Sequence, residues 1–338
     1  MAVKVGINGF GRIGRNYLRA VLRSGADVEV VAVNDISSIE TNAHLLKYDS
    51  THGRLEQTVA LTDDGFEVGG RTIRVLAERD PAALPWGKLG VDVVIESTGV
   101  FTDGEKAAGH LKGGARTVLI SAPATNVDAT FVIGVNDGEL AKDRHKVVSA
   151  ASCTTNCFVP MVKVLDDSFG IRRGLMTTVH AYTNDQNLLD LTHKDLRRAR
   201  AAAVNIVPAS TGAARATSLV LESMKGRLDG VALRVPVPDG SITDFTGIIE
   251  ADVSADEVNN AFRKAAESEP LSRILVYTDE PVVSSDIVGS SASCTFDSGL
   301  TMSSPLGDGT TLVKVFGWYD NEWGYSNRLV DMTLLLGA

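Results

Sequence analysis

The chain has 338 residues, of which 44% are hydrophobic and 22% charged, and its formal net charge is -9. This length suits two domains better than one core, and the composition excludes a disordered or fibrous protein. The acidic balance argues against nucleic acid as a partner, because phosphate backbones select basic surfaces.

Cysteine usage and apolar runs bear on the cellular compartment. Three cysteines cannot all pair within one chain, so reduced thiols and a cytoplasmic location are expected. The apolar run at the N-terminus is too short for a signal peptide, and no stretch approaches the roughly 18 apolar residues of a membrane span. We therefore expect no association with a membrane.

The first half alternates short β-branched runs with helical stretches. Several of these runs are almost wholly apolar, which is typical of strands buried on both faces of a parallel sheet. The pattern predicts a doubly wound α/β domain over residues 1–150. Strands are expected at Val3–Ile7, Val28–Asn34, Thr72–Leu76, Val91–Glu96 and Thr117–Ser121, and helices at Arg12–Ser24 and Gly104–Leu111.

A glycine-rich motif lies between the first strand and the first helix. Gly9, Gly11 and Gly14 form a G-x-G-x-x-G pattern, which by itself also fits a plain tight turn. Asp35 follows the next strand, roughly 20 residues on, where a ribose-binding carboxylate is expected. This context favours a dinucleotide site. A carboxylate repels a ribose 2′-phosphate, so NAD is preferred, and secondary NADP use stays open.

The second half has longer predicted strands and one long polar stretch. Residues His180–Pro208 show little regular period, which indicates a functional or interface loop. Strands are expected at Leu175–His180, Val231–Val237 and Thr243–Ala251, a helix at Ala255–Glu267 capped by Ser254, and a final helix at Gly324–Leu336.

The segment around Cys153 is the strongest indication of catalytic chemistry in the sequence. It follows an apolar strand and opens a helical run, with Ser152 placed as the cap. A thiolate in the first helical turn is stabilised by the helix dipole, which predicts a nucleophile with a lowered pKa. A buried structural cysteine is an equally good interpretation of the pattern alone. Cys157 gives poor zinc spacing with Cys153, so no metal is expected.

His180 is the natural partner for this thiol, because it ends a predicted strand at the start of the long loop. A thiol and an NAD site together imply that a thiolate attacks an aldehyde, and that a base removes a proton as hydride leaves. The product is a thioester, which either water or inorganic phosphate could resolve.

Anion ligands gather near the same elements. Arginine and hydroxyl groups suit phosphate geometry, although an arginine run is also typical of a solvated or interface surface. The candidates are Thr183, Arg197, Arg198, Arg200, Ser210, Thr211, Gly212 and Arg234.

These residues resemble those of the phosphorylating glyceraldehyde-3-phosphate dehydrogenase family along almost the whole chain. The resemblance implies a Rossmann-type doubly wound parallel sheet, plus an α+β catalytic domain with a mainly antiparallel sheet over residues 151–317. It also implies that a C-terminal helix within 318–338 packs back on the NAD-binding domain. The matching segments are Gly6–Arg15, Lys47–Gly53, Ser152–Cys157, His180–Thr183, Ser210–Ala214 and Trp318–Asn327.

The same resemblance implies the roles of the site residues. Cys153 would be the nucleophile and His180 the base, with the Cys153 N–H and His180 stabilising the oxyanion. Inorganic phosphate would be held by Ser152, Thr154, Thr211 and Gly212. The phosphate of glyceraldehyde 3-phosphate would be held by Thr183, Arg234 and Arg198, with Arg197 as the alternative. NAD would be bound by Gly9, Gly11, Arg12, Ile13, Gly14, Asp35, Arg79, Ser121 and Asn321.

The resemblance further implies a homotetramer with the long loop at a subunit interface. Thr192 departs from the proline of strictly NAD-dependent relatives, which favours some tolerance of NADP. Two rival functions remain. Erythrose-4-phosphate dehydrogenases differ from this chain in the segments at His180–Asn187 and Ser210–Ala214. A nucleotide-binding redox sensor would modify Cys153 without turning over an aldehyde.

Overall fold

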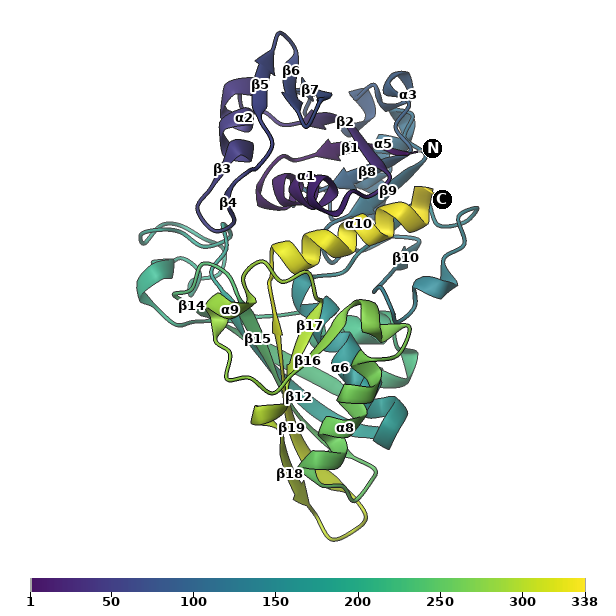
Figure 1. The fold of residues 1–338 in the computed structure, drawn as a ribbon, viewed down its shortest axis with the longest axis vertical. Coiled ribbons are helices and arrows are strands. Elements are labelled where there is room, and N and C mark those ends of the chain that lie inside the picture. The colour runs from purple at the N-terminus through teal and green to yellow at the C-terminus, as the bar shows by residue number, and fades with distance from the viewer. Residues whose placement is uncertain (1, 338) are drawn as a thin grey trace. The chain divides into compact units, whose positions relative to one another are not determined.

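The structure, a computed structural model, describes residues 2–337, which cluster into two compact units (Figure 1). The first unit contains residues 2–131, 139–151 and 326–337. The second contains residues 132–138 and 152–325.

A nine-stranded sheet organises the first unit, in the order β10-β11-β9-β8-β1-β2-β7-β6-β5. It is parallel from β10 to β7, and β6 and β5 add an antiparallel edge. Every residue of β8 and β9 is buried, as the apolar runs predict for central parallel strands. The strands are β1 (Val3–Asn8), β2 (Val28–Asn34), β5 (Val59–Thr62), β6 (Gly65–Val68), β7 (Arg71–Leu76), β8 (Val93–Glu96), β9 (Thr117–Ile120), β10 (Ala129–Thr130) and β11 (Val147–Ser149), beside a small hairpin of β3 (Tyr48–Asp49) and β4 (Gly53–Arg54).

Helices connect these strands. The helix expected over Gly104–Leu111 is two short helices, α4 and α5, with Asp103 capping the first through the N–H groups of Glu105 and Lys106. The helices are α1 (Arg12–Ser24), α2 (Ile39–Lys47), α3 (Trp86–Leu89), α4 (Gly104–Ala107) and α5 (Gly109–Lys112), with a 3₁₀ turn at Pro81–Ala83.

An eight-stranded mixed sheet forms the centre of the second unit, in the order β13-β14-β12-β15-β19-β17-β16, with β18 beside β19. The pairs β12/β14 and β16/β17 are parallel and the others antiparallel. The expected fold class, a parallel doubly wound domain followed by an α+β domain, is confirmed. The strands are β12 (Ile171–Ala181), β13 (Val207–Ser210), β14 (Leu228–Val235), β15 (Ser241–Ile249), β16 (Leu275–Thr278), β17 (Cys294–Asp297), β18 (Met302–Pro305) and β19 (Thr311–Tyr319).

Two helices, α6 (Cys153–Phe169) and α8 (Ala255–Ala266), pack on the sheet of the second unit (Figure 1). Strand β15 alternates buried and half-buried residues, and Phe245 from its buried face meets Phe158 of α6 at a ring-centroid distance of 5.4 Å. Ser254 caps α8 in a capping box with Glu257, as the sequence predicts. Helices α7 (Ala213–Ala216) and α9 (Ser284–Ile287) are single turns, and 3₁₀ turns lie at Ala202–Val204, Thr217–Leu219, Glu222–Met224, Leu271–Arg273 and Ser298–Leu300.

The C-terminal helix α10 spans Trp323–Gly337. This agrees with the final helix expected at Gly324–Leu336; at the start of the wider segment 318–338, Trp318 and Tyr319 still pair with β15 at the end of β19. From Ser326 on, α10 belongs to the first unit, where Tyr17 of α1 donates a hydrogen bond to Thr333 at 2.9 Å. None of the helices within residues 2–337 is long and apolar enough to cross a membrane.

Candidate active site

The glycine turn between β1 and α1 is sterically enforced at two positions. Gly9 has φ +91°, and a Cβ there would lie 2.6 Å from the Thr98 nitrogen. A Cβ on Gly14 would lie 2.3 Å from the Gly9 oxygen. Gly11 is exposed with open space around it, and it offers no side-chain cap to the first turn of α1. That turn also has no acidic residue, so its amides suit a pyrophosphate.

Asp35 lies beside this turn, directly after β2. Its Oδ2 accepts a hydrogen bond from the Phe10 amide at 2.9 Å, and its Oδ1 accepts one from the Ser37 amide at 2.8 Å. These two bonds hold the carboxylate next to the glycine turn, where it suits the hydroxyls of an adenosine ribose.

A buried polar network that the sequence did not predict supports both features. Asn8 and His110 both contact Oε2 of Glu96, at 2.6 and 3.0 Å. The Trp86 indole donates to Nδ1 of His110 at 3.0 Å, so the proton of the neutral imidazole lies on Nε2, facing Glu96. Asn34 donates to Oδ1 of Asn8 at 2.7 Å. Because two of these residues directly precede the glycine turn and the ribose candidate, the network fixes their backbone.

The other predicted cofactor ligands in the first unit differ in their surroundings. Arg12 forms an ion pair with Asp49. Burial alone would raise the pKa of Asp49, but hydrogen bonds from Arg12 and from the Thr51 and His52 amides lower this pKa to about 2. Of the remaining three candidates, Ile13 is half-buried in α1, the side chain of Arg79 is exposed, and Ser121 donates to the Glu96 carbonyl at 3.0 Å.

Cys153 is the first residue of α6 and is partly exposed. Ser152 caps the helix by accepting a hydrogen bond from the Thr155 amide at 3.0 Å. The Cys153 sulfur lies 3.4 Å from Nε2 of His180, near the end of β12. The second unit thus brings together the two residues that the sequence singled out as nucleophile and base.

The surroundings of Cys153 do not meet the expectation of a lowered pKa. Enough protein surrounds the sulfur for burial to raise the pKa of the thiol, while the Arg234 guanidinium and hydrogen bonding to Thr154 oppose this rise. The physical reason is that desolvation disfavours the thiolate more than these groups stabilise it.

His180 is only 5% exposed. Burial, followed by the positive charge of Arg234, lowers the pKa of His180 to about 3. Its Nδ1 lies 2.7 Å from the Ala181 carbonyl oxygen and 2.8 Å from Nη1 of Arg234. The imidazole is therefore neutral near pH 7, with a proton on one ring nitrogen and a lone pair on the other.

Tyr319 completes this centre and was not among the predicted site residues. Its hydroxyl lies 2.8 Å from the Thr154 hydroxyl and 2.7 Å from the Thr178 hydroxyl, and its ring meets His180 edge-on at 5.9 Å. Burial raises the pKa of Tyr319, so the phenol stays protonated. The residue lies within the matched segment Trp318–Asn327, but its partners are distant in sequence.

Of the candidates for the substrate phosphate, the structure groups Arg198 with Arg234. Arg198 is held by an ion pair with Asp185 and by a hydrogen bond to the Ser210 carbonyl at 3.3 Å. Its positive charge, after burial, contributes to lowering the pKa of Arg234, and Ser210 lies on β13, which pairs with the strand of Arg234, β14. The neighbouring Arg197 is exposed.

The candidates for inorganic phosphate lie at the starts of two helices that pack together, α6 and α7. The Thr154 hydroxyl is engaged with Tyr319, while Thr211 accepts a hydrogen bond from the Ala213 amide at 3.2 Å. Gly212 is exposed and precedes α7. Thr183 is half-buried just beyond β12.

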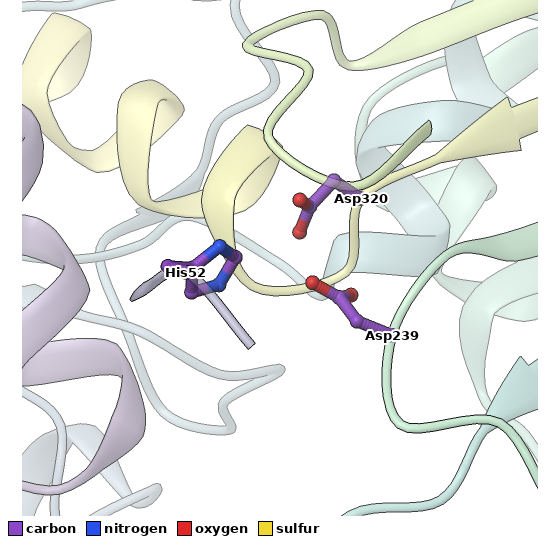
Figure 2. A group of neighbouring side chains, drawn as sticks. All are labelled: His52, Asp239 and Asp320. Carbon is purple, nitrogen blue, oxygen red and sulfur yellow. The ribbon is translucent and has the colours of Figure 1, made fainter. Parts of the chain in front are cut away.

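Two carboxyl groups of the second unit form a buried pair that the sequence did not signal. Figure 2 shows the carboxyl groups of Asp239 and Asp320 turned toward each other. A carboxyl oxygen of one residue lies within 4.8 Å of a carboxyl oxygen of the other. His52, which is also drawn, belongs to the first unit. Asp320 accepts hydrogen bonds from the Gly289, Glu322 and Trp323 amides at 2.7, 2.9 and 2.6 Å. Burial, then the charge of Asp320, raises the pKa of Asp239 to about 9. Asp239 is therefore protonated near pH 7 and can donate a hydrogen bond to Asp320.

Asn321, the predicted cofactor ligand in the second unit, is held by Ser241. The buried Ser241 hydroxyl accepts a hydrogen bond from the Ala181 amide at 3.0 Å and donates to Oδ1 of Asn321 at 2.6 Å. This orientation directs the Nδ2 amino group of Asn321 away from Ser241, as a donor.

A glycine turn of the dinucleotide-binding type with a carboxylate beside it, and a cysteine at a helix start next to a histidine, are typical of an NAD-linked oxidoreductase. Comparison with known proteins agrees. Residues 3–104 match the NAD binding domain of glyceraldehyde 3-phosphate dehydrogenase, and residues 152–321 match its C-terminal domain.

Curated relatives match over the full length. The chain is 61% identical over 337 residues to a glyceraldehyde-3-phosphate dehydrogenase of Streptomyces coelicolor, covering 100% of this chain and 99% of the relative. It is 60% identical over 343 residues, with the same coverage, to one of Mycobacterium tuberculosis. The chain belongs to the glyceraldehyde-3-phosphate dehydrogenase family, an NAD-dependent oxidoreductase family, which confirms the predicted family, enzyme class and cofactor.

Proposed function

We propose that the protein oxidises D-glyceraldehyde 3-phosphate with NAD and inorganic phosphate, giving 1,3-bisphosphoglycerate and NADH. The observation that carries this proposal is the 3.4 Å contact between the Cys153 sulfur and Nε2 of His180 at the start of α6. Family membership supports the substrate, because the named relatives carry the same activity in their names.

In the first half-reaction Nε2 of His180 takes the thiol proton of Cys153, the resulting thiolate attacks the aldehyde carbon, and the carbonyl π electrons move to oxygen. The Cys153 N–H and the protonated His180 stabilise this oxyanion, and His180 returns the proton to it, which gives a hemithioacetal. His180 next removes the hydroxyl proton as the C–H bond breaks, which leaves a thioester. NAD, when bound, supplies the hydride acceptor.

In the second half-reaction an oxygen of inorganic phosphate attacks the thioester carbon. The C–S bond breaks, the acyl phosphate forms, and Cys153 leaves as a thiolate. Ser152, Thr154, Thr211 and Gly212 hold the attacking phosphate. Thr183, Arg198 and Arg234 hold the phosphate of the substrate.

The first unit binds NAD. The enforced glycine turn receives the pyrophosphate on the uncapped start of α1, and Asp35 receives the ribose hydroxyls. NAD is preferred over NADP, because Asp35 would lie against a 2′-phosphate. Arg12, Ile13, Arg79, Ser121 and Asn321 complete the cofactor ligands.

We assign NAD binding to residues 1–150 together with the C-terminal helix, and catalysis to residues 151–317. We further propose a cytoplasmic homotetramer. Exposed leucines of the long loop, Leu188 and Leu189 among them, support its place at a subunit interface.

A rapid-mixing experiment tests this reaction. Purified protein is mixed with glyceraldehyde 3-phosphate and NAD, and NADH absorbance is followed with and without inorganic phosphate. We expect a burst of about one NADH per active site without phosphate, and sustained turnover when phosphate is added.

Matched variants sharpen the result. Cys153→Ser should abolish the burst, whereas Cys157→Ser, one turn further into α6 and fully buried, should keep it. Sustained turnover without phosphate would mean that water resolves the thioester. No burst from reduced protein would refute the enzymatic reaction as written.

A further inference from the structure

The side chain proposed to hold the substrate phosphate also contacts the base. Arg234 of β14 and His180 of β12 are direct partners in the register of two adjacent parallel strands. Nη1 of Arg234 lies 2.8 Å from Nδ1 of His180 and donates to the Ala181 carbonyl at 3.0 Å. A guanidinium group is always protonated and can only donate.

This contact determines which nitrogen of His180 carries the proton. When Arg234 donates to Nδ1, the neutral ring must carry its proton on Nε2, the nitrogen that faces the Cys153 sulfur. That tautomer can donate to an oxyanion, but it cannot accept the hemithioacetal proton at Nε2. The other tautomer, with Nδ1–H donating to the Ala181 oxygen 2.7 Å away, leaves the lone pair of Nε2 available.

The charged and titratable groups around His180 come from several elements. Arg234 is the cation in direct contact with the ring, and its charge also stabilises the Cys153 thiolate. The groups that act on His180 or Arg234 are Cys153 from α6, Tyr319 from β19, and Asp185 and Arg198 from the long loop, while Asp239, from the segment before β15, acts on Cys153.

We propose that the phosphate of the substrate activates His180 through Arg234: when a phosphate dianion binds the guanidinium, Arg234 stops donating to Nδ1, and His180 adopts the tautomer whose Nε2 accepts a proton. This inference rests on the proposed function. Arg234 is then a positioning residue for the base as well as a ligand of the substrate.

Specificity for a phosphorylated aldehyde would therefore be expressed in the rate of thioester formation, and not only in binding. An aldehyde without a phosphate leaves Arg234 on the imidazole, so proton removal is slow even at saturation. Neutralising the guanidinium also removes its lowering effect on the pKa values of His180 and Cys153. Both groups then titrate at higher pH when the phosphate is bound.

The test supplies the aldehyde and the phosphate group of the substrate as two separate molecules, D-glyceraldehyde and phosphite dianion. The rate constant of the NADH burst is measured without inorganic phosphate, using saturating D-glyceraldehyde, with and without phosphite dianion. Competition with glyceraldehyde 3-phosphate shows whether phosphite occupies the site. We expect phosphite to raise the burst rate constant about tenfold or more, a part of what general base catalysis contributes. The acid-side midpoint of its pH profile should move to higher pH.

Two arginine variants provide the matched comparison. Arg234→Met should make the burst insensitive to phosphite and give both aldehydes the same pH midpoint. Arg198→Met removes the other guanidinium of the pair, which makes no contact with His180 in the described residues, and should only raise the half-saturating concentration of glyceraldehyde 3-phosphate. Thermal unfolding midpoints verify that both variants fold.

Several outcomes would overturn the inference. Phosphite that competes with the substrate but leaves the burst rate constant of glyceraldehyde unchanged would overturn the inference, as would phosphite that does not compete at all. An Arg198→Met variant that loses phosphite activation at saturation would assign the coupling to total charge instead of to Arg234. Absence of a burst with every aldehyde would overturn the proposed function itself.

Discussion

The buried Asp239–Asp320 pair makes the stability of the protein depend on pH in a direction opposite to that of an ordinary ion-paired carboxylate. Its surroundings raise the pKa of Asp239 to about 9, whereas an unperturbed aspartate has a value of 3.8. Between these two values the folded chain holds a proton that the unfolded chain releases. The free energy of unfolding must therefore fall as pH rises, by about 1.4 kcal/mol per pH unit from this group.

Asp239→Asn should abolish this contribution. An amide has the shape of the protonated acid, and its N–H can donate to Asp320 without any exchange of a proton with solvent. From about pH 6 to about pH 8 the wild type should lose roughly 2.7 kcal/mol relative to the variant. The difference in stability between the two proteins should therefore shift by this amount in favour of the variant across this range.

Urea unfolding, followed by circular dichroism at several pH values across this range, measures the difference directly. Asp320→Asn serves as the matched control: it removes the carboxylate that accepts three backbone N–H groups and should destabilise the protein at every pH in this range. If wild type and Asp239→Asn show the same dependence on pH, Asp239 is not protonated in the folded protein and the argument fails.

Three further predictions concern packing and positioning. Gly317→Ala should lower the free energy of unfolding, measured by thermal unfolding, by about 1–3 kcal/mol, because a Cβ there meets the Met161 sulfur at 2.5 Å. The control Gly138→Ala has open space around the new Cβ and should leave the free energy of unfolding nearly unchanged. Tyr319→Phe should lower the free energy of unfolding by about 1–3 kcal/mol, because the hydroxyls of Thr154 and Thr178 lose the partner that they share. An unchanged thermal unfolding midpoint would contradict this. Ser241→Ala should raise the KM for NAD about threefold to tenfold, because the Asn321 amide loses the hydrogen bond that orients it. The KM for the aldehyde should not change. Equal changes in both constants would indicate a general disturbance of the fold and contradict the prediction.

Helix and strand positions within short segments were largely predictable from the sequence, because they depend on residues only a few positions apart. The strand–glycine turn–helix unit was correct, with α1 found at Arg12–Ser24 as expected, because alternating residue types and steric freedom act over a few positions. The same holds for the start of α6, where Ser152 caps the helix that presents Cys153. Strand β19 was not predicted, since its half-buried pattern is recognisable only beside β15.

The sequence by itself determined which chemistry this protein can perform: a dinucleotide turn with its carboxylate, a cysteine at a helix start, and a histidine at a strand end. Only the tertiary structure decided how that chemistry is controlled. The contact of Arg234 with His180 arises from the register of two strands, and Tyr319 reaches its threonine partners from the far end of the chain. Burial also reversed the expected shift in the pKa of Cys153, because desolvation depends on every segment packed around the sulfur and not on the few residues that precede it.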